Sequence, residues 1–116
     1  MKVHQTIEDE IAYAQRMADI GNICLMEASL REAKKDPRYA RQANELRDYG
    51  YTHAVEIHVD NAEKWARQVR LNMQLPDSRE WLERNLDLAK AYAQIAGVDI
   101  SKKIEEILAS TEKITA

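Results

Sequence analysis

Acidic side chains that could act together lie at two places in the second half of the chain. Asp60 and Glu63 are three residues apart, and Glu83 and Asp87 are four residues apart. In a helix, either spacing puts both carboxylates on one face. Two such faces brought together would offer the oxygen ligands that Mg²⁺ prefers, with positions left open for a phosphate substrate. These four residues form the first candidate metal site.

A second candidate set surrounds the segment RDYGYTHAVEIHVD, residues 47–60, which holds two of the three histidines. His53 and Glu56 are three residues apart and share a helix face. Asp19 and Glu27 lie on the preceding helical stretch, which we expect to pack against this one. The four side chains would suit a small metal site. The alternative is a ladder of salt bridges and hydrogen bonds between helices.

Residues 56–113 resemble the all-α NTP pyrophosphohydrolases, the MazG-like group. In that family an ExxE helix precedes an ExxD helix. Here DNAE (60–63) and RNLD (84–87) stand at those places, and AGVDISKKIEEIL (96–108) is similar to the segment that follows. The resemblance implies Mg²⁺-dependent hydrolysis of nucleoside triphosphates. The chain departs from the pattern at Arg84, where the first acid of ExxD is expected, although Glu83 is adjacent.

Residues 36–66 resemble the second helix of ferritin-like proteins, which opens with DP and carries an E-x-x-H pair that binds iron. The chain has DP at 36–37 and His53 at the histidine position, but Gly50 replaces the glutamate. The resemblance implies an iron-binding helical bundle. Arg47 and His53 also fit the loose R-x4–6-H pattern of the HEPN ribonucleases.

Composition narrows the class of protein. The 116 residues predict one domain, residues 1–116. A 45% hydrophobic content with no Phe and only five Gly and Pro residues favours helix. The net charge of −3 argues against a nucleic-acid partner. Cys24 is the only cysteine, so an internal disulfide is excluded, and we expect it to be buried. Without a signal-like or membrane-length apolar run, we expect a cytoplasmic protein with no membrane partner.

Helix start and stop signals predict an all-α antiparallel bundle. Two long helices are expected at about 6–34 and 37–74, and two shorter ones at about 78–96 and 100–112. Thr6, Asp36 and Asp77 are the predicted N-caps, and Gly97 is a stop after the third helix. No segment shows the alternation typical of a strand.

The apolar stripes predict self-association. The helix at 37–74 should change its buried face between His53 and Val59. The helix at 78–96 carries two neighbouring stripes, one of which contains Trp81, Leu88, Tyr92 and Ile95. One small bundle cannot hide this much apolar surface, so we expect a homo-oligomer, most simply a dimer. The predicted interface residues are Val55, Val59, Ala62, Trp65, Val69, Trp81 and Tyr92.

The leading functional interpretation is a non-catalytic interaction protein, an adaptor, inhibitor or assembly component that acts through its helical faces on itself or on another protein. It needs no cofactor. A metal enzyme or a metal-storage bundle, with Mg²⁺ or iron, is the alternative that the family resemblances imply.

Overall fold

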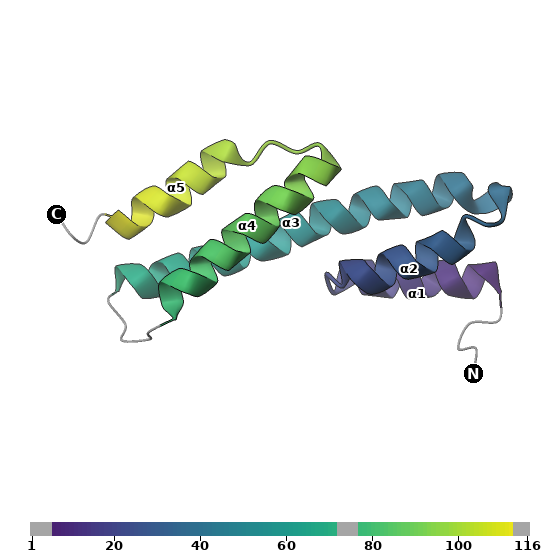
Figure 1. Cartoon of the computed structure of the whole chain (residues 1–116), viewed down its shortest axis with the longest axis horizontal. Helices are drawn as coiled ribbons and strands as arrows, with labels where there is room; N and C mark the ends of the chain where they lie inside the picture. Colours follow the sequence, from purple (N-terminus) through teal and green to yellow (C-terminus); the bar gives the residue numbers. More distant parts are fainter. Residues whose placement is uncertain (1–5, 72–76, 113–116) are drawn as a thin grey trace. The chain divides into compact units, whose positions relative to one another are not determined.

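A computed structural model of the chain describes residues 6–71 and 77–112, whose regular elements are all helices and include no strand. The elements are α1 (Ile7–Asp19), α2 (Ile23–Ala33), the short 3₁₀ helix η1 (Pro37–Tyr39), α3 (Ala40–Arg70), α4 (Ser78–Ala96) and α5 (Ser101–Glu112) (Figure 1). The predicted all-α class is therefore confirmed. The chain divides into two compact units, Met1–Ala54 and Val55–Ala116, and α3 contributes to each. No helix within the described residues is both long and apolar enough to cross a membrane.

The first predicted helix, 6–34, is broken in the structure. Helix α1 ends at Asp19, and Gly21 takes a φ of +78° before α2 begins. Glycine reaches this left-handed conformation without the steric cost of a Cβ atom. Asn22 then caps α2, because its side-chain oxygen accepts a hydrogen bond of 3.1 Å from the Leu25 backbone N–H. The two helices pack against each other within the first unit (Figure 1).

The break changes which side chains of α2 are buried. Leu25 and Ala28 continue the apolar stripe of 7–21 in the sequence, yet Leu25 is 42% exposed and Ala28 is also exposed. Met26 and Leu30 are buried instead. Cys24 is exposed, so the prediction of a buried cysteine was wrong. Because the turn at Gly21 interrupts the regular helical spacing, the apolar stripe of α1 does not continue into α2.

Small residues bring α3 close to α1 and α2 in the first unit. Ala14, Ala18 and Ala43 are fully buried there. A Cβ atom added at Gly50 would overlap the Met26 sulfur and would lie 3.3 Å from Cβ of Ala18. Glycine at position 50 is therefore required by the close approach of these helices.

The buried stripe of α3 shifts at the boundary between the units. In the first unit it runs through Ala43, Leu46, Gly50 and Ala54, and in the second through Val55, Val59, Ala62 and Ala66. Successive helical residues are about 100° apart, so the buried face rotates by that angle between Ala54 and Val55. This confirms the predicted change of face. Helix α3 ends at Arg70, and the rest of its predicted span to 74 lies almost wholly outside the described residues.

The second unit has a core built from α3, α4 and α5. Its buried residues are Val55, Val59, Ala62, Ala66, Leu82, Leu86, Ala89, Ala93, Ile104 and Ile107. Gly97 ends α4 as predicted, with a φ of +73°. Asp77 is the N-cap residue of α4, as predicted, but its side chain makes no capping hydrogen bond. At the other predicted caps, Thr6 accepts from the Asp9 N–H and Asp36 from the Arg38 N–H, both at 3.0 Å.

Candidate functional site

The four acids of the first predicted metal site do not form a group that could hold a metal ion in the described part of the chain, and one of them is paired with a lysine. Nζ of Lys103, on α5, lies 2.7 Å from Oε1 of Glu63. The hydrogen bond with Glu63 raises the pKa of Lys103, and the nearby charges of Glu106 and Asp60 add to this effect. Asp60, Glu83 and Asp87 are exposed. Glu63 is therefore paired with a cation of α5, and the other three acids face solvent.

The second predicted set forms a hydrogen-bond ladder. Tyr49 Oη donates to Oδ1 of Asp19 at 2.6 Å, and Gln15 Nε2 donates to the same oxygen at 3.0 Å. These two hydrogen bonds lower the pKa of Asp19. His53 Nε2 is 2.9 Å from the backbone oxygen of Asp19, which only accepts, so Nε2 carries the hydrogen. The Tyr49 and His53 rings stack at 5.7 Å.

The other two members of that set are Glu27 and Glu56. Glu27 forms an ion pair with Arg47, with 2.8 Å between Oε1 and Nε, and Glu56 is exposed on α3. Throughout residues 6–71 and 77–112, no group of three or more His, Cys, Asp or Glu side chains is arranged to hold a metal ion. The contacts present in the first unit match the salt-bridge and hydrogen-bond alternative.

Most of the predicted interface residues pack inside the second unit. Val55, Val59 and Ala62 belong to its core, and Trp65, Val69 and Tyr92 pack against that core. Only Trp81 leaves a large part of its side chain, 44%, exposed. Hydrophobic periodicity marked these positions as apolar without distinguishing burial in one chain from burial between two.

An apolar face of α4 remains uncovered within the described chain. Leu88 is 40% exposed and Ile95 is 49% exposed, and with Trp81 they are spaced seven residues apart. Seven residues make nearly two helical turns, so the three side chains lie in one row. Tyr92 is half-buried beside them. We refer to Trp81, Leu88, Tyr92 and Ile95 as the α4 apolar face.

A buried polar contact holds α3 against this part of α4. His58 Nδ1 lies 2.9 Å from Oδ1 of Asn85, whose Nδ2 donates to the Trp81 backbone oxygen at 2.9 Å. Since the Asn85 oxygen accepts, Nδ1 of His58 carries the hydrogen. Asn85 is only 8% exposed, so losing either partner would leave a buried polar group unpaired. The contact fixes the backbone that carries Trp81.

Aromatic stacking continues from this contact toward the end of α3. The Trp65 and Trp81 rings stack with centroids 6.2 Å apart and an interplanar angle of 19°. The Arg84 guanidinium lies 5.1 Å from the Trp81 ring and also pairs with Glu80 at 2.8 Å. Trp81 is therefore contacted by the Trp65 ring and by the Arg84 guanidinium, although 44% of Trp81 is exposed.

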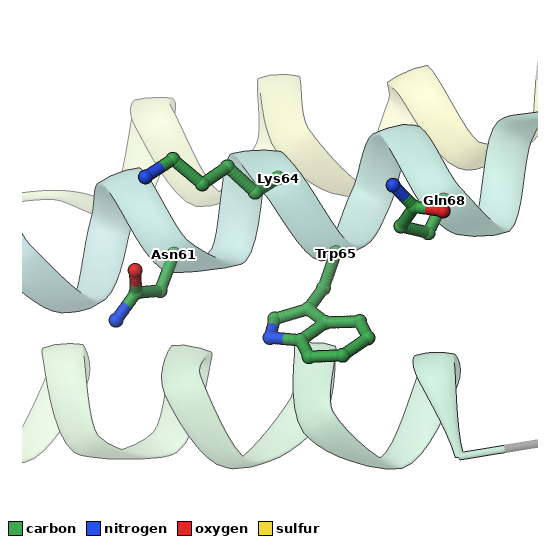
Figure 2. A pocket seen from close by; sticks show the side chains of 4 residues that line it. All are labelled: Asn61, Lys64, Trp65 and Gln68. Atoms are coloured by element: carbon green, nitrogen blue, oxygen red, sulfur yellow. The ribbon is translucent and has the colours of Figure 1, made fainter. Parts of the chain in front are cut away.

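A hollow of about 280 Å³ lies beside Trp65 (Figure 2). Its lining side chains are Asn61, Lys64, Trp65 and Gln68, which follow one another at helical spacing on α3. Oε1 of Gln68 is buried and has no hydrogen-bond partner in the part of the chain that the structure describes. The sequence analysis took Trp65 as an interface residue and singled out none of the other three.

A scan against protein-family models finds no match, and searches of curated proteins and of solved structures find no similar chain. The MazG-like and ferritin-like resemblances stay predictions.

Proposed function

We propose that the chain is a non-catalytic helix-packing protein that self-associates through the α4 apolar face, in the manner of an adaptor, inhibitor or assembly component. The observation that carries the proposal is the row of large apolar side chains on α4, which stay 40–49% exposed in the single chain. Contiguous apolar surface of this kind is uncommon on monomeric proteins and marks interaction sites.

The spacing of the row favours a helix as the docking element. Trp81, Leu88 and Ile95 repeat every seven residues, the period at which side chains of one helix insert between those of another. Charged and polar residues border the row, with Glu80, Asp87 and Gln94 all exposed along one edge. An apolar centre with a polar border is the usual composition of a protein–protein interface.

A second copy of the chain fits this face because the row is symmetric about Leu88. In an antiparallel pair related by a two-fold axis, Leu88 meets its equivalent, and Trp81 lies opposite Ile95 of the second copy. Such self-complementarity is the property of a two-fold interface. Helix α4 has 19 residues and is about 28 Å long. A pair built on one such helix falls at or below the standard interface of roughly 800 Å² per partner, so we expect a dissociation constant in the micromolar range.

Sedimentation equilibrium tests this proposal from about 1 µM to 1 mM protein, a range that spans the expected dissociation constant. The wild-type chain should pass from monomer to dimer. Leu88→Glu should remain monomeric, because two carboxylates would meet at the two-fold axis. Gln42→Glu is the matched control, since it adds the same charge at an exposed helical position of α3 in the first unit, outside the α4 apolar face and its polar border. A wild-type chain that stays monomeric throughout, or equal effects of the two variants, contradicts the proposal.

A further inference from the structure

We infer that the α4 apolar face selects a partner helix with a lysine or arginine beside its own apolar row, and that Asp87 makes this selection. The inference rests on the proposed function, because it concerns the same face and names the chemistry of the helix that fits it best. Three observations carry it: the place of Asp87 beside the centre of the row, the lack of an ion pair at Asp87 among the described residues, and the symmetry of the row about Leu88.

Asp87 lies at the edge of the α4 apolar face, level with the centre of the row. It directly precedes Leu88 in the helix, and it is exposed. Each residue advances a helix by about 1.5 Å and turns it by about 100°. Asp87 therefore borders the middle of the row without belonging to it. Charged residues at such flanking positions set which helices pair with each other.

The charge of Asp87 is not compensated by an ion pair within the described part of the chain. Arg84, about one turn before Leu88, is already paired with Glu80 at 2.8 Å. Lys90 follows two residues after Leu88, so it is turned about 200° from the row and lies on the other side of the helix. The border of the face therefore carries an uncompensated negative charge at its centre.

A second copy of the chain brings two such charges together. In the two-fold pair about Leu88, both copies turn the same edge of α4 to the same side of the pair. The two Asp87 residues then lie within about 3 Å of each other along the helix direction. Like charges that meet across an interface oppose pairing. A lysine or arginine at this position of a partner helix would replace the repulsion with an attraction.

The chain itself supplies a probe for this preference, because Asp87→Lys has the same apolar row with a base beside it. Sedimentation equilibrium compares wild type, Asp87→Lys and their equimolar mixture at one total concentration, in about 20 mM salt, where charges are weakly screened. The mixed pair should have a dissociation constant about three- to tenfold below that of either protein alone. The mixture should therefore show the highest average mass. About 0.5 M salt should remove most of this difference, because it shortens the screening length to a few ångströms.

Two further variants test the role of Asp87 itself. Asp87→Asn removes the repulsion between copies, so it should self-associate about two- to threefold more tightly than wild type. Asp48→Lys is the matched control, since it makes the same substitution at an exposed position of α3 in the first unit, outside the α4 apolar face and its polar border. Mixing Asp48→Lys with wild type should give no gain in association.

The inference is overturned if wild type and Asp87→Lys associate no more strongly together than apart, or if Asp48→Lys produces the same gain. Equal self-association of Asp87→Asn and wild type also contradicts it. Failure of the proposed function gives a different result. A wild-type chain that stays monomeric but associates with Asp87→Lys contradicts self-association and supports the selectivity of the face, whereas a wild-type dimer with no gain on mixing does the reverse.

Discussion

Replacing Gly50 with alanine tests the close helix crossing in the first unit. The added Cβ would overlap the Met26 sulfur and would lie 3.0 Å from Met26 Cε and 3.3 Å from Ala18 Cβ. Met26 is fully buried, so its side chain has no solvent into which to move. Alanine is favoured over glycine by about 1 kcal/mol inside a helix, whereas overpacking a tight core costs about 1–3 kcal/mol. We expect Gly50→Ala to lower the free energy of unfolding by up to about 2 kcal/mol.

The same substitution should have the opposite sign when Met26 is removed. Met26→Ala alone should cost about 2–5 kcal/mol, because it leaves a cavity. In that background the new methyl group at position 50 no longer meets a thioether. Ala18 Cβ remains 3.3 Å away, but the space left by Met26 lets the two methyl groups move apart, so the helix propensity dominates. Gly50→Ala should then raise the free energy of unfolding by up to about 1 kcal/mol.

The four proteins of this double-mutant cycle can be compared by urea unfolding followed by far-ultraviolet circular dichroism. If Gly50→Ala stabilises the otherwise wild-type chain, the helices do not approach as closely as described. An effect of the same sign and size in both backgrounds would show that Met26 is not the side chain that excludes a Cβ atom.

Three further predictions concern single sites. Gly97→Ala should lower the free energy of unfolding by about 1–2 kcal/mol through backbone strain alone, because φ is +73° and nothing lies within 4 Å of the added Cβ; a thermal melt showing no loss would contradict this. Hydrogen bonds from Tyr49 and Gln15 lower the pKa of Asp19. The contribution of Asp19 to stability should be present above its unfolded-state pKa and lost as pH falls through its folded-state pKa. Tyr49→Phe should raise the pKa of the Asp19 carboxyl, which an NMR titration measures. An unchanged pKa would argue against the hydrogen bond. The hydrogen bond with Glu63 raises the pKa of Lys103. The contribution of Lys103 to folding stability should therefore be present below its unfolded-state pKa and lost as pH rises through its folded-state pKa. A Lys103 pKa that is the same in Glu63→Gln would refute the pairing.

Local signals predicted the helical class and several helix ends. Thr6, Asp36 and Gly97 act through backbone contacts a few residues away, so the sequence nearby is enough to place them. The change of buried face on α3 was also predictable, because it depends only on helical spacing. Gly21 was not predicted as a break, because a glycine in a row of small residues fits a helix crossing as well as a left-handed turn.

The candidate site was harder to predict, because it depends on which neighbour each face meets. Spacing placed Asp60 and Glu63 on one side of α3, but only the folded chain shows that Lys103 reaches Glu63. The two apolar stripes of α4 are offset by one residue, so that Leu82 belongs to one stripe and Trp81 to the other. Periodicity alone does not show which of the two stripes is buried. The unpaired oxygen of Gln68 leaves no trace in the sequence, since a glutamine on a helix ordinarily faces water.

The placement of the two tryptophans gives the chain a built-in optical reporter. Trp65 and Trp81 both belong to the second unit and stack on each other, so tryptophan fluorescence, excited where tyrosine does not absorb, reports on that unit only. Far-ultraviolet circular dichroism reports on helix in both units, including the 31 residues of α3 that they share. Unfolding curves that coincide by the two methods would mean that α3 joins the units into one cooperative transition. Curves that separate would measure how far one half of the protein can lose its structure while the other half keeps its own.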